Sequence, residues 1–123
     1  MKKIGALRGA TQVLNEENDI VEQIGILYDE LLFKNHIAEQ DIISIIFSVT
    51  DDITAKNPAA ALRQSGRAAE TPLFSTLEPK IPPLYPRIIR VLLHAYLEDG
   101  VLNRHIYRNG AELLRSDWAA ASN

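Results

Sequence analysis

The segment from Asp41 to Val49 most constrains the fold of this 123-residue chain, because it is almost continuously apolar. Its isoleucine-rich composition favours a strand, since β-branched side chains pack well on a pleated surface. Apolar runs without alternation are typical of strands that are covered on both faces. We therefore predict a central strand, buried on both faces, that ends at Thr50-Asp51-Asp52.

Apolar spacing before this run predicts a strand followed by a helix. Residues Ile4 to Ala10 have the character of a short strand that ends in small residues. The side chains Ile20, Ile24, Leu27 and Leu31 then recur at spacings of four, three and four, which is one face of an amphipathic helix. We expect this helix to begin at Asn15-Glu16-Glu17, with Asn15 as its cap, and to reach about Asn35.

After the apolar run, the sequence predicts a second helix and a third strand. Asn57 is the expected cap of this helix, Pro58 fits its first turn, and Gly66 can end it. Pro72 to Glu78 is predicted to form a strand. Residues 81–86 contain three prolines and are expected to form a loop.

The segment from Arg87 to Leu97 fits two structures. Charged and polar side chains recur in it at helical spacing, yet a strand would place Ile89, Val91 and Leu93 on one face and Arg90 on the other. Periodicity alone leaves both open.

The order of elements predicts an α+β or α/β layer fold with helices on one face of the sheet. Residues 111–114 are expected to form a last short strand. We predict a single domain over residues 1–115 and a C-terminal tail over residues 116–123 that frays. Such a short sheet has open edges, and oligomerisation is one way to cover them.

Composition excludes several classes of function. The formal net charge is −3, so no overall positive field draws the chain to nucleic acid or to a membrane surface. Without cysteine there is no disulfide, iron–sulfur cluster or thiol nucleophile, which fits a cytoplasmic protein. No signal peptide or membrane span is expected at the N-terminus, and the histidine spacing matches no metal site. The sequence also has no glycine-rich phosphate loop and no Gly-x-Ser-x-Gly motif.

Four arginines are the candidate functional groups. Arg8 ends the first strand beside the small residues Gly9 and Ala10, and Arg63, Arg90 and Arg115 each lie at or near the edge of another predicted element. An arginine within or beside an apolar run needs a partner, because an unpaired buried charge is costly. That partner is either an internal carboxylate, such as Glu78, or an anionic ligand. We expect Arg67, Arg87, Arg104 and Arg108 to be solvated surface residues.

A series of short motifs runs along the chain in a defined order and spacing. They are Arg8-Gly9-Ala10-Thr11, Asn57-Pro58-Ala59 with Arg63, Glu78, Ile89-Arg90-Val91, Arg104-His105-Ile106-Tyr107, Ala111 and Leu114-Arg115. Together they resemble the monofunctional AroH-class chorismate mutases over roughly residues 4 to 115. The shared order and spacing make the resemblance more specific than any single motif.

The resemblance implies a fold, an assembly and a reaction. The implied subunit is ferredoxin-like, with Arg87 to Leu97 as a strand, and three subunits form a homotrimer with a pseudo-α/β barrel core and active sites between neighbours. The implied reaction is the Claisen rearrangement of chorismate to prephenate in aromatic amino-acid biosynthesis, with no cofactor and no metal. The alternatives are a small-molecule-binding trimer of similar fold, in the manner of the enamine deaminases, and a structural oligomer.

The resemblance also implies residue roles. Arg90 and Glu78 are the expected catalytic residues, with Arg90 facing the ether oxygen and Glu78 accepting from the substrate hydroxyl. The expected substrate-binding residues are Arg8, Arg63, Leu73, Phe74, Ser75, Tyr107 and Arg115. The chain departs from the family pattern at Asn57, Ala60 and Ser75, where an aromatic residue, a lysine and a cysteine are common.

Overall fold

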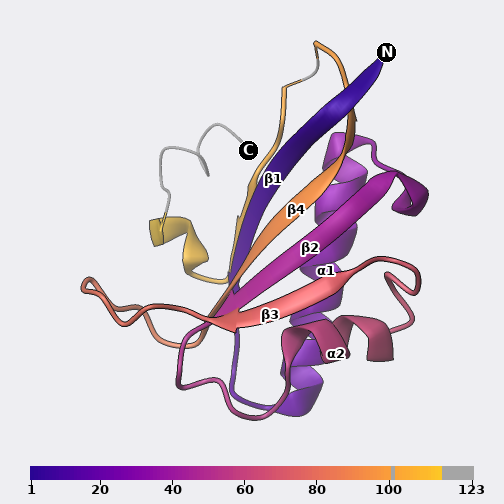
Figure 1. The fold of residues 1–123 in the computed structure, drawn as a ribbon. Helices are drawn as coiled ribbons and strands as arrows, with labels where there is room; N and C mark the ends of the chain where they lie inside the picture. The colour runs from indigo at the N-terminus through magenta and orange to yellow at the C-terminus, as the bar shows by residue number, and fades with distance from the viewer. Residues whose placement is uncertain (101, 115–123) are drawn as a thin grey trace.

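A five-stranded mixed sheet with two α-helices on one of its faces forms the fold (Figure 1). The computed structural model describes residues 1–100 and 102–114. The strands lie in the order β3-β2-β4-β1-β5, in which β4 runs antiparallel to β1 and β2, while β2–β3 and β1–β5 are parallel pairs. The elements are β1 (Lys2–Gln12), α1 (Glu17–Asn35), η1 (Glu39–Asp41), β2 (Ile42–Val49), α2 (Pro58–Gln64), β3 (Leu73–Leu77), β4 (Ile88–Glu98), β5 (Ile106–Arg108) and η2 (Ala111–Leu114).

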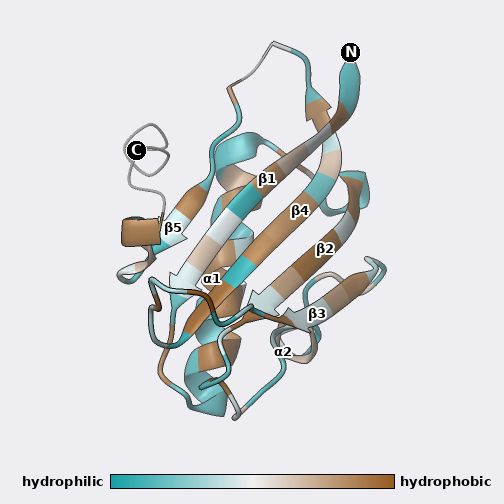
Figure 2. Cartoon of the chain, turned by 60° about the vertical axis from the view of Figure 1, so that its left-hand side comes forward, coloured by the Kyte–Doolittle hydropathy of each residue, from teal (hydrophilic) through white to brown (hydrophobic). Residues whose placement is uncertain are grey.

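The predicted α+β layering is confirmed, with both helices on the same side of the sheet (Figure 2). The main core lies between the helices and the sheet. Leu27 and Leu31 of α1 and Leu62 of α2 are almost fully buried there, together with Phe47 and Leu93 from the strands. Burial of such side chains is the main favourable term in folding.

The prediction that Asp41 to Val49 is buried on both faces is wrong for a single chain. Ile45 and Phe47 face the helices and are buried, whereas Ile46 on the opposite face keeps 37% of its surface exposed. β2 is an interior strand, but the centre of the sheet is β4. The continuous apolar run therefore has a second face that nothing in the described part of the chain covers fully.

The segment from Arg87 to Leu97 is a strand, as the family resemblance implies. β4 pairs along most of its length with both β1 and β2, so its backbone polar groups are used in two ladders. Ile89, Val91 and Leu93 face the helices and are buried, while Arg90 on the opposite face is exposed. Pairing on both edges decides between the two structures that local periodicity leaves open.

Two local predictions are wrong. Asn15 does not cap α1, whose N-cap is Glu16; the Asn15 Oδ1 atom instead accepts from the backbone N–H groups of Thr54 and Ala55, each at 2.9 Å, and ties this turn to the loop after β2. Residues 111–114 form the 3₁₀ helix η2 and not a strand, and the strand lies before it at β5. The turn at Gly110, with φ of +99°, separates the two elements.

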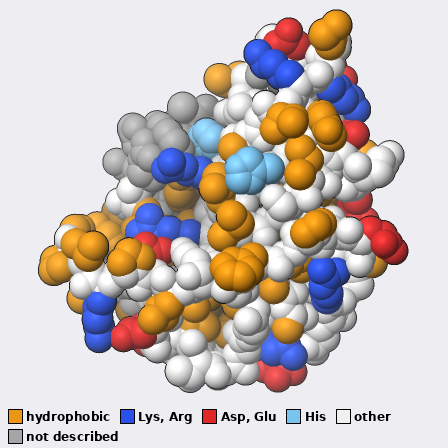
Figure 3. Space-filling model, in the orientation of Figure 1, with side chains coloured by type: hydrophobic (Ala, Val, Ile, Leu, Met, Phe, Trp, Pro, Cys, Tyr) orange, Lys and Arg blue, Asp and Glu red, His pale blue; other side chains and the backbone are white. Residues whose placement is uncertain are grey.

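The sheet face opposite the helices carries exposed apolar side chains. Ile4 is 61% exposed, Phe74 65% and Tyr96 46%, and all three lie on strands of this open face. In Figure 3, which has the orientation of Figure 1, hydrophobic side chains run across this face, with charged groups towards its margins. Clustered exposed apolar surface on a folded chain marks an interaction site. Within residues 1–100 and 102–114, no helix has the length and apolar character needed to cross a membrane.

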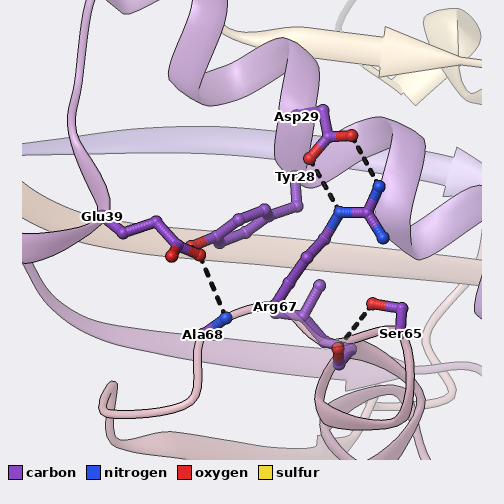
Figure 4. Close-up of polar contacts among 7 residues, drawn as sticks. Tyr28, Asp29, Glu39, Ser65, Arg67 and Ala68 are labelled. Carbon is purple, nitrogen blue, oxygen red and sulfur yellow. Dashed lines mark hydrogen bonds and ion pairs between the residues drawn. The ribbon is translucent and has the colours of Figure 1, made fainter.

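A polar cluster connects α1 to the segment after α2 (Figure 4). The Tyr28 hydroxyl donates to Glu39 Oε1 at 2.7 Å, and the Ala68 backbone N–H donates to the same oxygen at 3.1 Å. Arg67, which we expected to be solvated, forms a bidentate pair with Asp29 at 2.8 and 2.7 Å. The hydrogen bond from Tyr28 and that from Ala68 lower the pKa of Glu39, while burial and the Glu39 contact raise the pKa of Tyr28.

Replacing Glu39 by Gln is expected to make stability less dependent on pH. The pKa of Glu39 is lower in the folded chain than in the unfolded chain. Its contribution to the free energy of unfolding is therefore fully present above the unfolded pKa and is lost as the pH falls through the folded pKa. Urea unfolding at pH 7 should show a loss of about 1 kcal/mol or less, since Glu39 is exposed to water.

At a pH near 3 the variant and the parent chain should unfold at the same urea concentration. Glu22→Gln, which alters an exposed carboxylate of α1, is the matched control and should behave as the parent chain at both pH values. An equal loss of stability for Glu39→Gln at both pH values would contradict a pH-dependent contribution from the Glu39 carboxylate.

Candidate active site on the open face of the sheet

Sheet register brings two of the predicted arginines to one place. Ala10 of β1 and Ser48 of β2 are both paired with Arg90 of β4, and Arg8 lies two residues before Ala10 on the same face of β1. Because alternate residues of a strand share a face, Arg8, Ser48 and Arg90 all project from the open face. They border a cavity of about 240 Å³, whose lining residues are Arg8, Gly9, Ala10, Ile46, Ser48, Arg90, Val91, Leu92 and Tyr107.

Glu78, the residue directly after β3, contacts both Arg90 and Ser48. Glu78 Oε1 lies 3.3 Å from Arg90 Nε and accepts a hydrogen bond of 2.5 Å from the Ser48 hydroxyl. The Glu78 backbone N–H donates to Val49 O at 2.8 Å, which extends the β2–β3 pairing to the carboxylate. The Arg90 side chain remains 45% exposed, so it keeps access to solvent on the open face.

Arg8 and Tyr107 form the other side of this cavity. The Arg8 backbone N–H donates to His105 Nδ1 at 3.0 Å, which attaches the segment before β5 to β1. Tyr107 of β5 is paired with Ala10, and it packs against a small second core of Ala10, Ile88 and Ala111. Tyr107 lines the cavity together with Arg8 and Arg90.

Arg63 does not line this cavity. Its guanidinium donates to the carbonyl groups of Ala68 and Thr71 at 2.7 Å and to that of Ala69 at 3.0 Å, and so it closes the segment between α2 and β3. All three acceptors are backbone carbonyl groups and none is a carboxylate, and the Arg63 side chain is exposed. Arg63 is both a structural tie and an available cation.

The remaining predicted site residues do not lie together. Phe74 lies on the open face beside Ile46, while Leu73 packs against the main core. The Ser75 hydroxyl donates to Asn57 Oδ1 at 2.8 Å, and the same oxygen caps α2 by accepting from the Ala59 N–H at 2.9 Å. Two of the positions that depart from the family pattern are thus bonded to each other. Arg115 lies outside the described residues.

A larger cavity of about 490 Å³ is lined by the loop between β3 and β4 together with Glu78 and Arg90. Lys80 and Asp51, which also line it, form an ion pair of 2.9 Å. Arg90 also lines the smaller cavity, so it lies where the two meet.

Sequence reasoning did not identify Ser48 and His105 as members of this region. Ser48 is one of two serines in the apolar run, and a small polar residue there was a weak signal for a residue facing away from the core. Of the arginines expected to be solvated, Arg108 is also partnered, with its Nε 3.0 Å from Glu30 on α1. No group of acidic or histidine side chains in residues 1–100 and 102–114 is arranged to hold a metal ion.

The arrangement is suited to a small anion. Two arginines, a phenol and a carboxylate border one shallow region, with apolar side chains from Ile46 and Leu92 between them. Arginine binds planar carboxylates by paired hydrogen bonds, and a fixed Glu78 selects against ligands that lack a donor at that point. A ligand with more than one carboxylate and one hydroxyl group meets these requirements.

Comparison with known proteins gives one consistent result. Residues 4–118 match the family described as chorismate mutase type I. The chorismate mutase AroH of Thermus thermophilus is 37% identical, with 94% of this chain and 98% of the relative covered, and that of Bacillus subtilis is 27% identical, with 98% and 96% covered. A solved structure of a chorismate mutase from Clostridium thermocellum has a TM-score of 0.80 and 39% identity over 89% of this chain and 98% of that chain.

Proposed function

This chain belongs to the chorismate mutase type I family and is a chorismate mutase, and we propose that it works by orientation and electrostatics alone. The observation that carries this proposal is Arg90, held at 3.3 Å by Glu78 on the open face beside Arg8 and Tyr107. The reaction is the rearrangement of chorismate to prephenate, which is an isomerisation in aromatic amino-acid biosynthesis.

The chemistry of the rearrangement requires no acid, base or nucleophile. One C–O bond breaks and one C–C bond forms within the same molecule, so holding a compact chair-like conformer removes much of the entropic barrier. Negative charge grows on the ether oxygen as the C–O bond breaks. A fixed cation aimed at that oxygen binds the transition state more tightly than the substrate, and this difference is catalysis.

The proposed roles are those that the family resemblance implies, and the positions of Arg8, Arg90 and Tyr107 around one cavity support them. Arg90 faces the ether oxygen and one carboxylate, while Arg8 and Tyr107 bind a carboxylate from the neighbouring strands. Glu78 holds Arg90 and accepts from the substrate hydroxyl. Arg63, Leu73, Phe74, Ser75 and Arg115 are proposed to supply the opposite wall and the mouth of the site.

We propose that the site is completed between the subunits of a homotrimer. Within one chain the Arg90 cavity lies open to solvent, and Arg63 and Ser75 are attached to α2 and to its connection with β3. The exposed apolar side chains Ile4 and Tyr96 provide a surface for association of the open faces around a common axis. The edge of one subunit formed by α2 and β3, which carries Arg63 and Ser75, would then lie against the Arg90 cavity of the next.

The direct test is turnover of chorismate by the purified chain, without any added cofactor or metal. We expect loss of chorismate absorbance with formation of prephenate, at about a million times the spontaneous rate or more. A chain that is stabilised against heat by chorismate or another dicarboxylate but does not convert chorismate would instead be a binding protein. Absence of both effects would support a purely structural oligomer.

A further inference from the structure

We propose that Ser48 is a positioning residue that sets the direction of Glu78 and, through it, of Arg90. Its hydroxyl donates to Glu78 Oε1 at 2.5 Å, and Arg90 Nε lies 3.3 Å from that same oxygen. Ser48 therefore acts on a carboxylate that is already shared with the main cation of the cavity. This inference rests on the chorismate mutase activity proposed above and deepens it.

The backbone fixes Ser48 more firmly than it fixes Glu78. Ser48 lies within β2 and is paired on both sides, with Thr76 of β3 and Arg90 of β4. Glu78 follows the last residue of β3, where one backbone bond to Val49 holds it. A carboxylate on a strand end has several rotamers, and a hydrogen bond from an interior strand selects one of them.

Ser48 and Arg90 both contact the same carboxylate oxygen of Glu78, Oε1. The second carboxylate oxygen is therefore left to accept from the substrate hydroxyl. Without the Ser48 hydroxyl, the carboxylate can rotate and offer both oxygens to the guanidinium. Arg90 would then lose its fixed aim at the ether oxygen, while the charges that attract the substrate remain.

An isosteric pair of variants tests this role. Ser48→Val removes the hydroxyl and Ser48→Thr keeps it at nearly the same size. We expect kcat to fall roughly tenfold in the valine variant with KM changed less than about twofold, and the threonine variant to keep most of kcat. Ser44→Ala is the matched control, because Ser44 lies on the same face of β2 opposite His94 and should keep full activity.

A double-mutant cycle separates positioning from a structural effect. In a Glu78→Ala chain, Ser48→Val should lower kcat no further, since the carboxylate on which it acts is absent. An additional tenfold loss in that background, or full activity of Ser48→Val in the parent chain, would overturn the inference. If the valine variant does not fold, Ser48→Ala gives the same comparison without added bulk. A parent chain that fails to convert chorismate overturns the proposed function and not only the role of Ser48.

Discussion

Arg90→Ala is expected to lower kcat for chorismate by about three orders of magnitude. The guanidinium is the group best placed to meet charge that grows on the ether oxygen, because Glu78 fixes it and it faces both cavities of the open face. An interaction made mainly in the transition state affects kcat more than KM. Initial rates from loss of chorismate absorbance, measured over a range of concentrations, give both constants.

Two further variants show whether the loss comes from the missing guanidinium. Arg90→Lys keeps a charge but not the planar fork, so it should recover only part of the lost rate. Arg108→Ala removes an arginine from the neighbouring region that pairs with Glu30 of α1, and it should lower stability slightly and leave kcat unchanged. Turnover of Arg90→Ala within a few-fold of the parent chain would refute the electrostatic role.

The part of this site that could be predicted from the sequence is the identity of its charged groups. Arg8 and Arg90 stand out because each interrupts or ends an apolar segment, and such a charge must have a partner. Their meeting could not be predicted from spacing, because it depends on the pairing of Ala10 with Arg90 across β1 and β4. A slip of one residue in that register would turn one of the two arginines to the helix face.

Other differences between sequence and structure also come from contacts distant in the chain. Asn15 has the right residue type and place for a helix cap, yet its side chain bonds to the loop at Thr54. Arg63 bears the expected charge, but three carbonyl groups of a later segment hold its guanidinium. Ser48 is a small residue in an apolar run, and only the approach of Glu78 gives it a role. The chemical type of each side chain can be predicted from the local sequence, but the groups that it contacts cannot.

The open face explains why a single chain carries the charged groups of a site but leaves that site open to solvent. Ile46 belongs to the most apolar segment of the sequence and still keeps 37% of its surface exposed. A strand that is apolar on both faces but covered on only one face is expected where another subunit packs against the uncovered face. The same surface that carries Arg90 would then also carry the contacts between subunits.

Mixing two impaired variants is therefore expected to restore part of the activity. Arg90→Ala lacks the main cation, and Arg63→Ala should lower kcat/KM by about a hundredfold through loss of a carboxylate contact and of the tie to Ala68 and Thr71. If each site combines Arg90 of one subunit with Arg63 of the next, an equal mixture of the two chains contains intact sites. Random assembly into trimers gives intact sites at about a quarter of positions, and so about a quarter of the parent activity.

A second mixture provides the matched control, because it combines two residues of the same chain. Glu78 Oε1 lies 3.3 Å from Arg90 Nε within one subunit, so no site in a mixture of Arg90→Ala and Glu78→Ala contains both side chains. That mixture should show no more activity than its components after the same unfolding and reassembly. Recovery in the first mixture alone would establish a shared site. Failure of both, with trimers re-formed, would place Arg63 and Arg90 in the same subunit's site or remove Arg63 from it.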